Sequence, residues 1–294
     1  MVKKMMDLVE IEVKKSKKKI IIISIVATLV AALFLVLGFI FINQSQSVSK
    51  QKEEKLLAKE KQEHIIREKN KIIYNDSVKQ KIKKIYNYDG KRVFLTFDDG
   101  PSKSVTPFIL DLLKQENIKA TFFTLGSRVE LYPEIVKRAY EEGHYIANHG
   151  YSHVYKQIYC SAQTVLEEYQ KTEQAIQQAL GNTEFHSHLF RFPGGSKGGK
   201  YDAIKQEAIS LLDANQVTYV DWNALTADSA GMKTKEEMLE YVKSTIGNKK
   251  SVVILMHDAG DKILTYEMLP ELIKYLKEQG YEFQNIYDIM NEVE

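Results

Sequence analysis

From residue 93 onward, short apolar segments alternate with longer amphipathic ones, and this alternation restricts the fold more than any other feature. The apolar segments have the length and composition of buried strands, and they are Val93–Phe97, Ala120–Thr124, Tyr145–Ala147, Leu189–Phe192, Val217–Val220 and Val252–Met256, with one more near Phe283. The segments between them have helical periodicity, at Val105–Glu116, Pro133–Glu142, Ala162–Ala179, Ile204–Asp213, Lys235–Ile246 and Tyr266–Gln279. Such alternation predicts an α/β fold with a parallel sheet, either a barrel or a doubly wound layer.

Polar residues gather where the predicted strands end. They are Asp98, His149, Arg191, Asp221 and His257. In (β/α) barrels the active site lies at the C-terminal ends of the strands. The pattern therefore favours a (β/α) barrel with one site built from several strand ends.

Two adjacent carboxylates, Asp98 and Asp99, close the first apolar strand, and Gly100-Pro101 turns the chain at once. Two acids at the mouth of a buried strand repel each other and are costly to remove from water. A bound metal ion is the usual compensation. The sequence therefore predicts a metal site at this strand end.

Two histidines supply matching ligands. His149 and His153 are four residues apart, a spacing that predicts both imidazoles on one face of a helical turn. One carboxylate with two imidazoles is the three-ligand pattern of a catalytic zinc, which leaves a position open for water. The remaining carboxylate is then available as a base, and the predicted chemistry is hydrolysis.

The N-terminal region predicts a membrane anchor. Residues 20–42 are apolar and carry no charge, which matches the ~20 residues needed to cross a bilayer. A cleaved signal peptide is the alternative, but its apolar core is roughly 7–15 residues long and is followed by small residues, whereas this run ends Phe41-Ile42-Asn43-Gln44. Residues 1–19 carry seven Lys and three acidic residues, so they are expected in the cytoplasm and the remainder outside.

Residues 43–92 read as an extracytoplasmic helical stalk, followed by a catalytic domain at 93–294. No Pro or Gly interrupts the stalk before Gly90, and apolar pairs recur along it, which leaves self-association through the stalk open. It contains fourteen Lys or Arg and seven acidic residues. This charge suits anionic lipid or wall polymer, with a solvated spacer as the alternative. The stretch lacks interleaved aromatic residues and is exported, so no nucleic acid partner is expected.

The ordered motifs resemble those of the family-four carbohydrate esterases, the polysaccharide deacetylases with a NodB-type domain. The resemblance covers residues 93 to about 290 and leaves out the anchor and the stalk. The motifs are Thr96-Phe97-Asp98-Asp99-Gly100-Pro101, His149 through His153, Arg191-Phe192-Pro193, Asp221-Trp222 and Leu255-Met256-His257. The resemblance implies a distorted (β/α) barrel that removes N-acetyl groups from sugars with a divalent metal, usually zinc. Cobalt or nickel suits the same ligand atoms.

The resemblance also implies a role for each motif residue. Asp98 would be the base, and Asp99 would bind the metal with His149 and His153. His257 would be the acid, assisted by Asp221, and Arg191 would position Asp98. The residues expected to contact the substrate are Pro193, Gly194 through its backbone N–H, and Trp222 and Leu255 as an apolar slot for the acetyl methyl. The only role expected for Asp228 is to help shape the sugar groove.

Three residues depart from the family pattern. Gly150 stands where Ser or Thr is usual, Gly194 where an aromatic residue is common, and Thr218 where some wall deacetylases carry an aspartate. None of them removes a metal ligand, the acid or the base. They bear instead on the choice of substrate.

The sequence therefore predicts a membrane-anchored N-deacetylase acting on N-acetylglucosamine in cell-wall glycan. The substrate is either the peptidoglycan backbone or the linkage unit of a wall-attached polysaccharide. Two alternatives are a non-catalytic wall-binding protein on the same fold and a deacetylase of chitin or xylan. A metallopeptidase would require a His-Glu-x-x-His sequence, which is absent.

Overall fold

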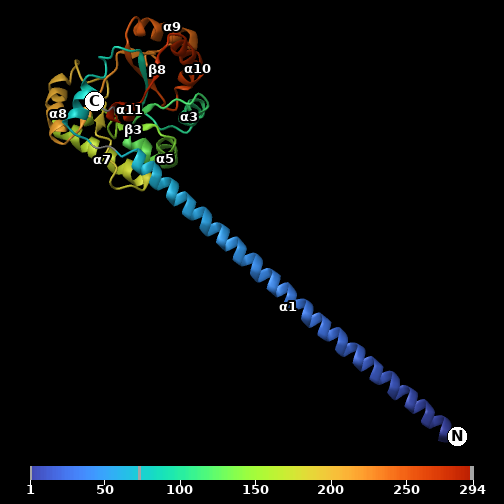
Figure 1. Ribbon diagram of the computed structural model, residues 1–294. Coiled ribbons are helices and arrows are strands. Elements are labelled where there is room, and N and C mark those ends of the chain that lie inside the picture. Colours follow the sequence, from blue (N-terminus) through green and yellow to red (C-terminus); the bar gives the residue numbers. More distant parts are fainter. Residues whose placement is uncertain (1, 72–73, 292–294) are drawn as a thin grey trace. The chain divides into compact units, whose positions relative to one another are not determined.

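The computed structural model describes residues 2–71 and 74–291, which fall into two compact units, Met1–Ile65 and Ile66–Glu294. The first unit consists of most of helix α1 (Val2–Lys69), a single unbroken helix in Figure 1. The predicted stalk is thus helical as far as residue 69. Since no Pro or Gly occurs between residues 39 and 69, nothing in that part of the sequence would break the helix.

Helix α1 contains the one stretch in the described part of the chain that is long and apolar enough to cross a membrane. Its most apolar window has a mean hydropathy of 3.2. Large apolar side chains such as Phe34 and Phe41 are exposed along it. A helix that is apolar on all sides requires an apolar environment, which a bilayer provides.

The second unit contains a parallel sheet with helices around it. The strands are β1 (Arg92–Asp98), β2 (Thr121–Thr124), β3 (Tyr145–Asn148), β4 (Leu189–Phe190), β5 (Thr218–Tyr219), β6 (Ala224–Leu225), β7 (Ser251–His257) and β8 (Glu282–Phe283). The helices after α1 are α2 (Asp76–Lys83), α3 (Thr106–Gln115), α4 (Gly126–Leu131), α5 (Pro133–Glu141), α6 (Tyr155–Ile158), α7 (Ala162–Leu180), α8 (Asp202–Ala214), α9 (Lys235–Ile246), α10 (Ile263–Glu278) and α11 (Ile286–Asn291).

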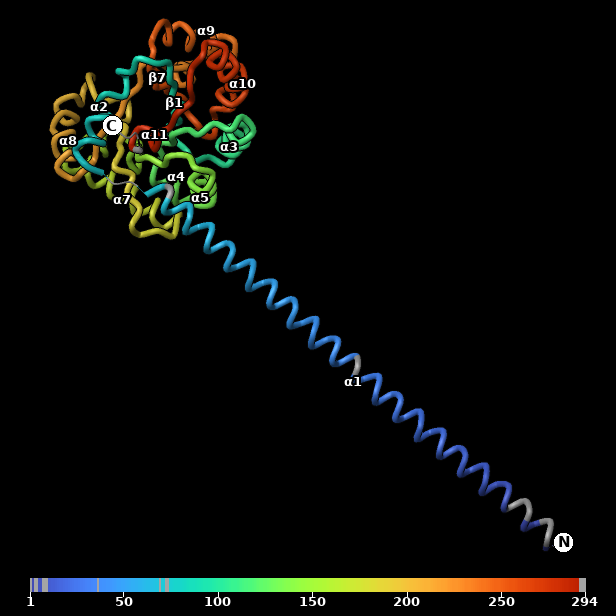
Figure 2. The backbone as a smooth tube through the Cα atoms, viewed as in Figure 1, coloured from blue at the N-terminus to red at the C-terminus, as the bar shows by residue number. Residues whose placement is uncertain are grey.

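The strands follow the order β5-β4-β3-β2-β1-β7-β6, and β8 pairs with the beginning of β1. Every pair is parallel. Helices α3, α5, α7, α8, α9 and α10 surround the strands in Figure 1, and the tube in Figure 2 follows the same curled path. Strands β5 and β6 lie at the two ends of this order and are not paired with each other in the described chain. The predicted distorted (β/α) barrel is therefore confirmed.

Strand β1 is buried along its whole length, and its two faces differ. Val93, Leu95 and Phe97 pack in the cluster beneath the outer helices, whereas Phe94 belongs to a second cluster on the inner side. Because side chains alternate along a strand, Asp98 shares the inner side with Phe94. The register aligns Asp98 with His257 of β7. Two residues with predicted chemical roles are thus brought side by side by the pairing of the two longest strands.

Helices α2 and α11 pack against the inner side of the sheet. Val78 and Ile82 of α2 and Ile286 and Ile289 of α11 join the same cluster as Phe94. The sequence-based prediction places residues 76–83 in the stalk, because most of them are polar or charged. Only Val78 and Ile82, four residues apart on one face, mark α2 as a packing helix. The compact unit accordingly begins before residue 92, at Ile66.

A pair of substitutions tests the contribution of α2 to the folded unit. Ile82 is 1% exposed and Leu57 in α1 is 66% exposed. We expect Ile82→Ala to lower the free energy of unfolding by about 2–5 kcal/mol, since it leaves a cavity, and Leu57→Ala to leave it nearly unchanged. Chemical denaturation of the full chain in detergent measures both. Equal, small effects would show that α2 is not part of the cooperative unit.

A candidate metal-dependent active site

The two carboxylates of the first motif face one space from different backbone conformations. Asp98 ends β1 in strand geometry and is 2% exposed. The next residue, Asp99, has φ of 72°, a left-handed conformation that aspartate tolerates better than most residues. Continued strand geometry would turn the second side chain to the opposite face of the sheet. The turn at Asp99 prevents this, so both carboxylates lie at the C-terminal end of β1.

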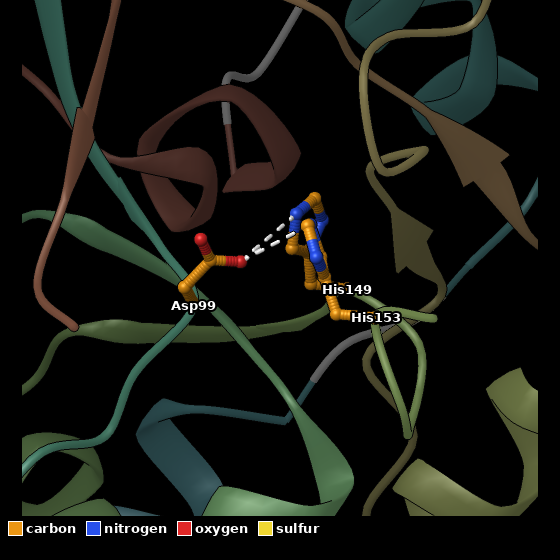
Figure 3. A group of neighbouring side chains, drawn as sticks. All are labelled: Asp99, His149 and His153. Carbon is orange, nitrogen blue, oxygen red and sulfur yellow. Dashed lines mark ion pairs between the residues drawn. The ribbon is translucent and has the colours of Figure 1, made fainter. Parts of the chain in front are cut away.

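The histidines approach Asp99 from the end of β3 (Figure 3). The Nε2 atom of His149 lies 3.5 Å from Oδ1 of Asp99, and that of His153 lies 3.4 Å from the same oxygen. The segment between the histidines is a loop, and His153 has φ of 55°. The prediction of a helical turn is therefore wrong, although the two imidazoles converge as it required. The chain reverses direction at Gly150, where φ is 83°, and this turn brings the two imidazoles to the same side.

The protonation state of His149 suits metal binding. Its Nδ1 lies 2.8 Å from the carbonyl oxygen of Arg191, which can only accept a hydrogen bond. The proton is thus on Nδ1, and the Nε2 lone pair points toward Asp99. Burial lowers the pKa of His149 to about 3, so the imidazole is neutral at physiological pH.

The donor set fits a divalent cation. The ligand atoms of Asp99, His149 and His153 all lie within 4.8 Å of one another, and they form the one such group among the described residues. Oδ1 of Asp99 is buried and has no hydrogen-bond partner. A buried carboxylate oxygen without a partner is costly, and a cation between it and the two imidazoles would remove that cost.

A cleft reaches this group from solvent. It is lined by Asp99, Leu125, Ser127, Arg128, Leu131, Ser152, His153 and Ala259. The side chain of His153 is 31% exposed and that of Asp99 is 22% exposed, whereas that of His149 is 3% exposed. Asp99 and His153 are therefore accessible from this cleft, as a site for an incoming substrate requires.

Arg191 holds Asp98 in place. Its Nη1 donates to Oδ1 of Asp98 at 2.9 Å and to Oγ1 of Thr96 at 2.7 Å. The guanidinium is fully buried and lies 3.9 Å from the ring centroid of Phe123. Burial raises the pKa of Asp98 above its ordinary value, and the charge of Arg191 opposes that rise. The result is a fixed carboxylate that is more basic than an exposed aspartate.

His257 is paired with Asp228. Its Nδ1 lies 2.8 Å from Oδ1 of Asp228, and its backbone N–H donates to Oδ2 of the same carboxylate at 2.7 Å. Thr265 donates to Oδ2 as well. Burial lowers the pKa of His257, but the hydrogen bond and the charge of Asp228 outweigh it and raise the pKa to about 9. His257 is thus protonated at neutral pH, and its Nε2 lies 4.0 Å from Oδ2 of Asp99.

The partner of His257 differs from the sequence-based assignment, which gave this role to Asp221. The Asp221 carboxylate instead accepts hydrogen bonds from the backbone N–H and the hydroxyl of Ser196. Its backbone carbonyl accepts from Nη2 of Arg191. Asp221 follows β5 at one end of the sheet order, whereas Asp228 follows β6, which pairs with β7. Strand β6 has only two residues, so the sequence offers no periodic signal for the segment that carries Asp228.

The remaining predicted residues border the same region. The Pro193 carbonyl accepts a hydrogen bond from Tyr159 at 2.7 Å, and Gly194 has φ of 75°. The N–H of Gly194 donates to none of the described residues. Trp222 lies against the glycine loop (residues 194–199), since a Cβ atom at Gly195 would be 3.3 Å from its ring. Leu255 is two residues before His257 on β7, and therefore on the same face.

Comparison with known proteins identifies the family. The sequence model of the family described as polysaccharide deacetylase matches residues 86–217. A Bacillus subtilis protein with the name "Putative polysaccharide deacetylase YheN" is 36% identical over 212 residues, which cover 69% of this chain and 70% of that protein. The chain belongs to the polysaccharide deacetylase family.

Two further comparisons agree with this assignment. The peptidoglycan-N-acetylglucosamine deacetylase PgdA of Listeria monocytogenes is 36% identical over 208 residues, which cover 69% of this chain but only 39% of that protein. The solved structure of a Streptococcus mutans CE4 esterase superposes with a TM-score of 0.64 at 32% identity, covering 72% of this chain and 92% of the other. The predicted family and the predicted hydrolase class are confirmed.

The pairing of His257 with Asp228 predicts a pH effect in this polysaccharide deacetylase. If protonated His257 is required, the rate falls as pH rises through its pKa. We expect Asp228→Asn to move this alkaline limb to lower pH, because the variant loses the carboxylate that raises the pKa of His257. Asp221→Asn should leave the limb in place. The pH dependence of kcat measures both, and a shift confined to Asp221→Asn would restore the sequence-based assignment.

Proposed function

We propose that this polysaccharide deacetylase hydrolyses the N-acetyl group of N-acetylglucosamine residues in peptidoglycan, releasing acetate and leaving a free amine. The observation that carries the proposal is the convergence of three groups on one space. These are the Asp99, His149 and His153 set, the Asp98–Arg191 pair and the Asp228–His257 pair. The substrate named for PgdA supports the choice of sugar and of polymer.

Asp99, His149 and His153 would hold the metal. One carboxylate oxygen and two imidazole nitrogens suit zinc, and the same atoms accept cobalt or nickel. When bound, such a metal supplies Lewis-acid activation of water and of the acetyl carbonyl. We propose zinc as the resident ion.

The protein residues carry the protons and orient the reactants. Asp98 accepts a proton from the attacking water as the water oxygen bonds to the acetyl carbon. Arg191 keeps the Asp98 carboxylate oriented. The unpartnered N–H of Gly194 donates to the acetyl oxygen as negative charge develops there. His257 gives its proton to the sugar nitrogen as the C–N bond breaks. Acetate and an amine result, and proton exchange with solvent restores Asp98 and His257.

A non-catalytic wall-binding role on the same fold is less well supported. A binding module has no need of a buried carboxylate held by a fully buried arginine. Nor does it need a second carboxylate that keeps a histidine protonated at neutral pH. Both pairs are costly to bury, and strongly perturbed ionisable groups cluster at functional sites. Their presence at one strand end therefore favours catalysis.

We further propose that the chain is a single-pass membrane protein with the catalytic unit outside. Residues 1–19, rich in Lys, would lie in the cytoplasm, residues 20–42 would span the bilayer, and the helix beyond residue 42 would separate the catalytic domain from the membrane. Its basic charge suits anionic lipid or wall polymer. Such a stalk would hold the site close to newly assembled wall. Stalk-mediated oligomers are compatible with this arrangement.

Topology is tested by adding protease to wall-stripped intact cells. We expect the catalytic unit to be removed, while an epitope placed at the N-terminus stays protected until the membrane is permeabilised. Full protection of the catalytic unit would contradict the exported orientation. A mature N-terminus near residue 43 would indicate cleavage of a signal peptide instead of an anchor.

The substrate is tested with the full chain in detergent, loaded with zinc. Acetate release is measured from peptidoglycan, chitin oligomers, acetylated xylan and wall-attached polysaccharide, with mass spectrometry of the products. We expect peptidoglycan hexosamines to lose the mass of one acetyl group each. A loss confined to another polymer would contradict the proposed substrate, and no loss from any of them would favour the binding role.

A further inference from the structure

Two of the family departures lie under the same short helix. Helix α6 begins two residues after His153, and its residues contact both Gly150 and Gly194. A Cβ atom at Gly150 would lie 2.8 Å from Cδ1 of Ile158, and one at Gly194 would lie 2.6 Å from the hydroxyl oxygen of Tyr155. Real Cβ atoms essentially never approach other atoms so closely. A Ser or Thr at position 150 would therefore require the end of the Ile158 side chain to move, and an aromatic residue at position 194 would require the Tyr155 hydroxyl to move.

Both glycines also have positive φ values, 83° and 75°. Side chains rarely adopt this conformation, so the backbone and the packing agree at both positions. Glycine at each of the two positions thus leaves room for a side chain of α6 in its present place. The two glycines allow α6 to sit directly on the loops that carry His149 and the Pro193–Gly194 turn.

This change brings Tyr155 to the metal ligands. Its ring lies edge-on to that of His153, with centroids 5.6 Å apart at an interplanar angle of 63°. Tyr159 and Tyr201 pack against it, at 5.7 Å and 6.4 Å. Because the Tyr159 hydroxyl donates to the Pro193 carbonyl, this aromatic group is tied to the turn that carries Gly194. The Tyr155 ring is therefore held in a defined position.

Tyr155 nevertheless retains capacity for a ligand. It is 40% exposed, and its hydroxyl has no hydrogen-bond partner among the described residues. A tyrosine with a packed ring and a free hydroxyl can cover the apolar face of a sugar and bond to its polar groups. The family pattern more often has an aromatic ring at position 194. Because this chain has Gly194, the turn after Pro193 contributes no side chain to the wall of the sugar-binding site.

We propose that Tyr155 is a substrate-contacting, specificity-determining residue that forms the sugar-binding wall left open at Gly194. Its ring packs against the sugar that carries the acetamido group, and its hydroxyl donates a hydrogen bond to that sugar. The wall thus comes from the segment after His153 instead of the turn after Pro193. The proposal rests on the proposed function, since it assumes an N-acetylhexosamine at the metal site.

Binding to a defined oligosaccharide tests the proposal apart from turnover. Trp222, the one tryptophan of the chain, borders the glycine loop and serves as a fluorescent reporter. The probe is a β-1,4-linked tetramer of N-acetylglucosamine, titrated into the full, zinc-loaded chain in detergent, in an Asp98→Asn background in which turnover is about 10²–10⁴-fold slower. We expect Tyr155→Phe to raise the Kd about 3–10-fold, the worth of one hydrogen bond, and Tyr155→Ala to raise it further.

A matched control separates this contact from a general loss of tyrosine. Tyr241 of α9 is 39% exposed, nearly the same as Tyr155. Tyr241→Phe should leave the Kd unchanged, and zinc content should remain stoichiometric in every variant. Equal affinities for the parent chain, Tyr155→Phe and Tyr155→Ala would overturn the proposal and leave the deacetylase function intact. Failure of the zinc-loaded chain with Asp98 intact to release acetate from peptidoglycan would instead overturn the proposed function.

A double substitution tests the packing that underlies the proposal. Gly194→Ala should weaken tetramer binding, because its Cβ atom displaces the Tyr155 hydroxyl. In the Tyr155→Phe background the same change should cost several-fold less, since the displaced atom is already absent. If the two penalties simply multiply, Tyr155 and Gly194 do not share one wall, and the proposal fails.

Discussion

Replacing His149 with alanine should abolish metal binding and deacetylase activity together. The substitution removes one of three ligand atoms, the one carried by the most buried of the three side chains. Loss of residues that merely orient a ligand lowers metal affinity 10–100-fold, so loss of a ligand should cost more than about 100-fold. We expect the purified variant to contain little zinc by elemental analysis and to release no acetate from peptidoglycan.

The control for this experiment is His64→Ala, which removes an exposed histidine of α1 and should change neither property. Circular dichroism shows whether the His149→Ala chain remains folded, and addition of excess zinc shows whether affinity alone is lost. Stoichiometric zinc in His149→Ala would contradict the ligand assignment. Restored activity at high zinc concentration would agree with it.

The second large effect is expected at Asp98. Asp98→Asn should lower kcat by about 10²–10⁴-fold, the usual contribution of a positioned acid or base, while zinc content stays unchanged. The amide oxygen at position 98 can still accept the hydrogen bond from Arg191, so the geometry is retained and only the basicity is lost. The acidic limb of the pH profile should disappear with the carboxylate, and His257 should still set the alkaline limb.

The neighbouring carboxylate provides the matched comparison. Asp99→Asn should reduce zinc content, because Oδ1 of Asp99 is the atom that both imidazoles face. A chain that loses zinc when Asp98 is changed but keeps it when Asp99 is changed would exchange the roles of the two residues. Equal activity of Asp98→Asn and the parent chain would remove Asp98 from the mechanism altogether.

The main strands could be predicted because burial in a parallel sheet requires continuous apolar runs. The predicted Val93–Phe97 lies within β1, and Val252–Met256 lies within β7. Short elements were missed for the opposite reason. Helices α4 and α6 and strand β6 have six residues or fewer, too few to show a period. From the sequence, helix α2 reads as part of the stalk because most of its residues are polar.

The candidate site, like the fold, could be predicted only in part from the sequence. The adjacent carboxylates and the two histidines were recognisable because their chemistry follows from residue type and from their position at strand ends. The partner of His257 was not, because Asp221 and Asp228 both follow short strands and both could reach a histidine in principle. Only the pairing of β6 with β7 selects Asp228. The local sequence does not indicate which strand pairs with β7.

By itself the sequence determined the apolar N-terminal segment, the α/β alternation and the donor atoms of the candidate site, since each depends on residue type and on local spacing. Tertiary structure alone decided which groups meet. It placed Asp228 beside His257 and α2 in the core, and it seated α6 on two glycines so that Tyr155 faces His153. Contacts between segments far apart in the chain depend on sheet order and close packing, which no local pattern encodes.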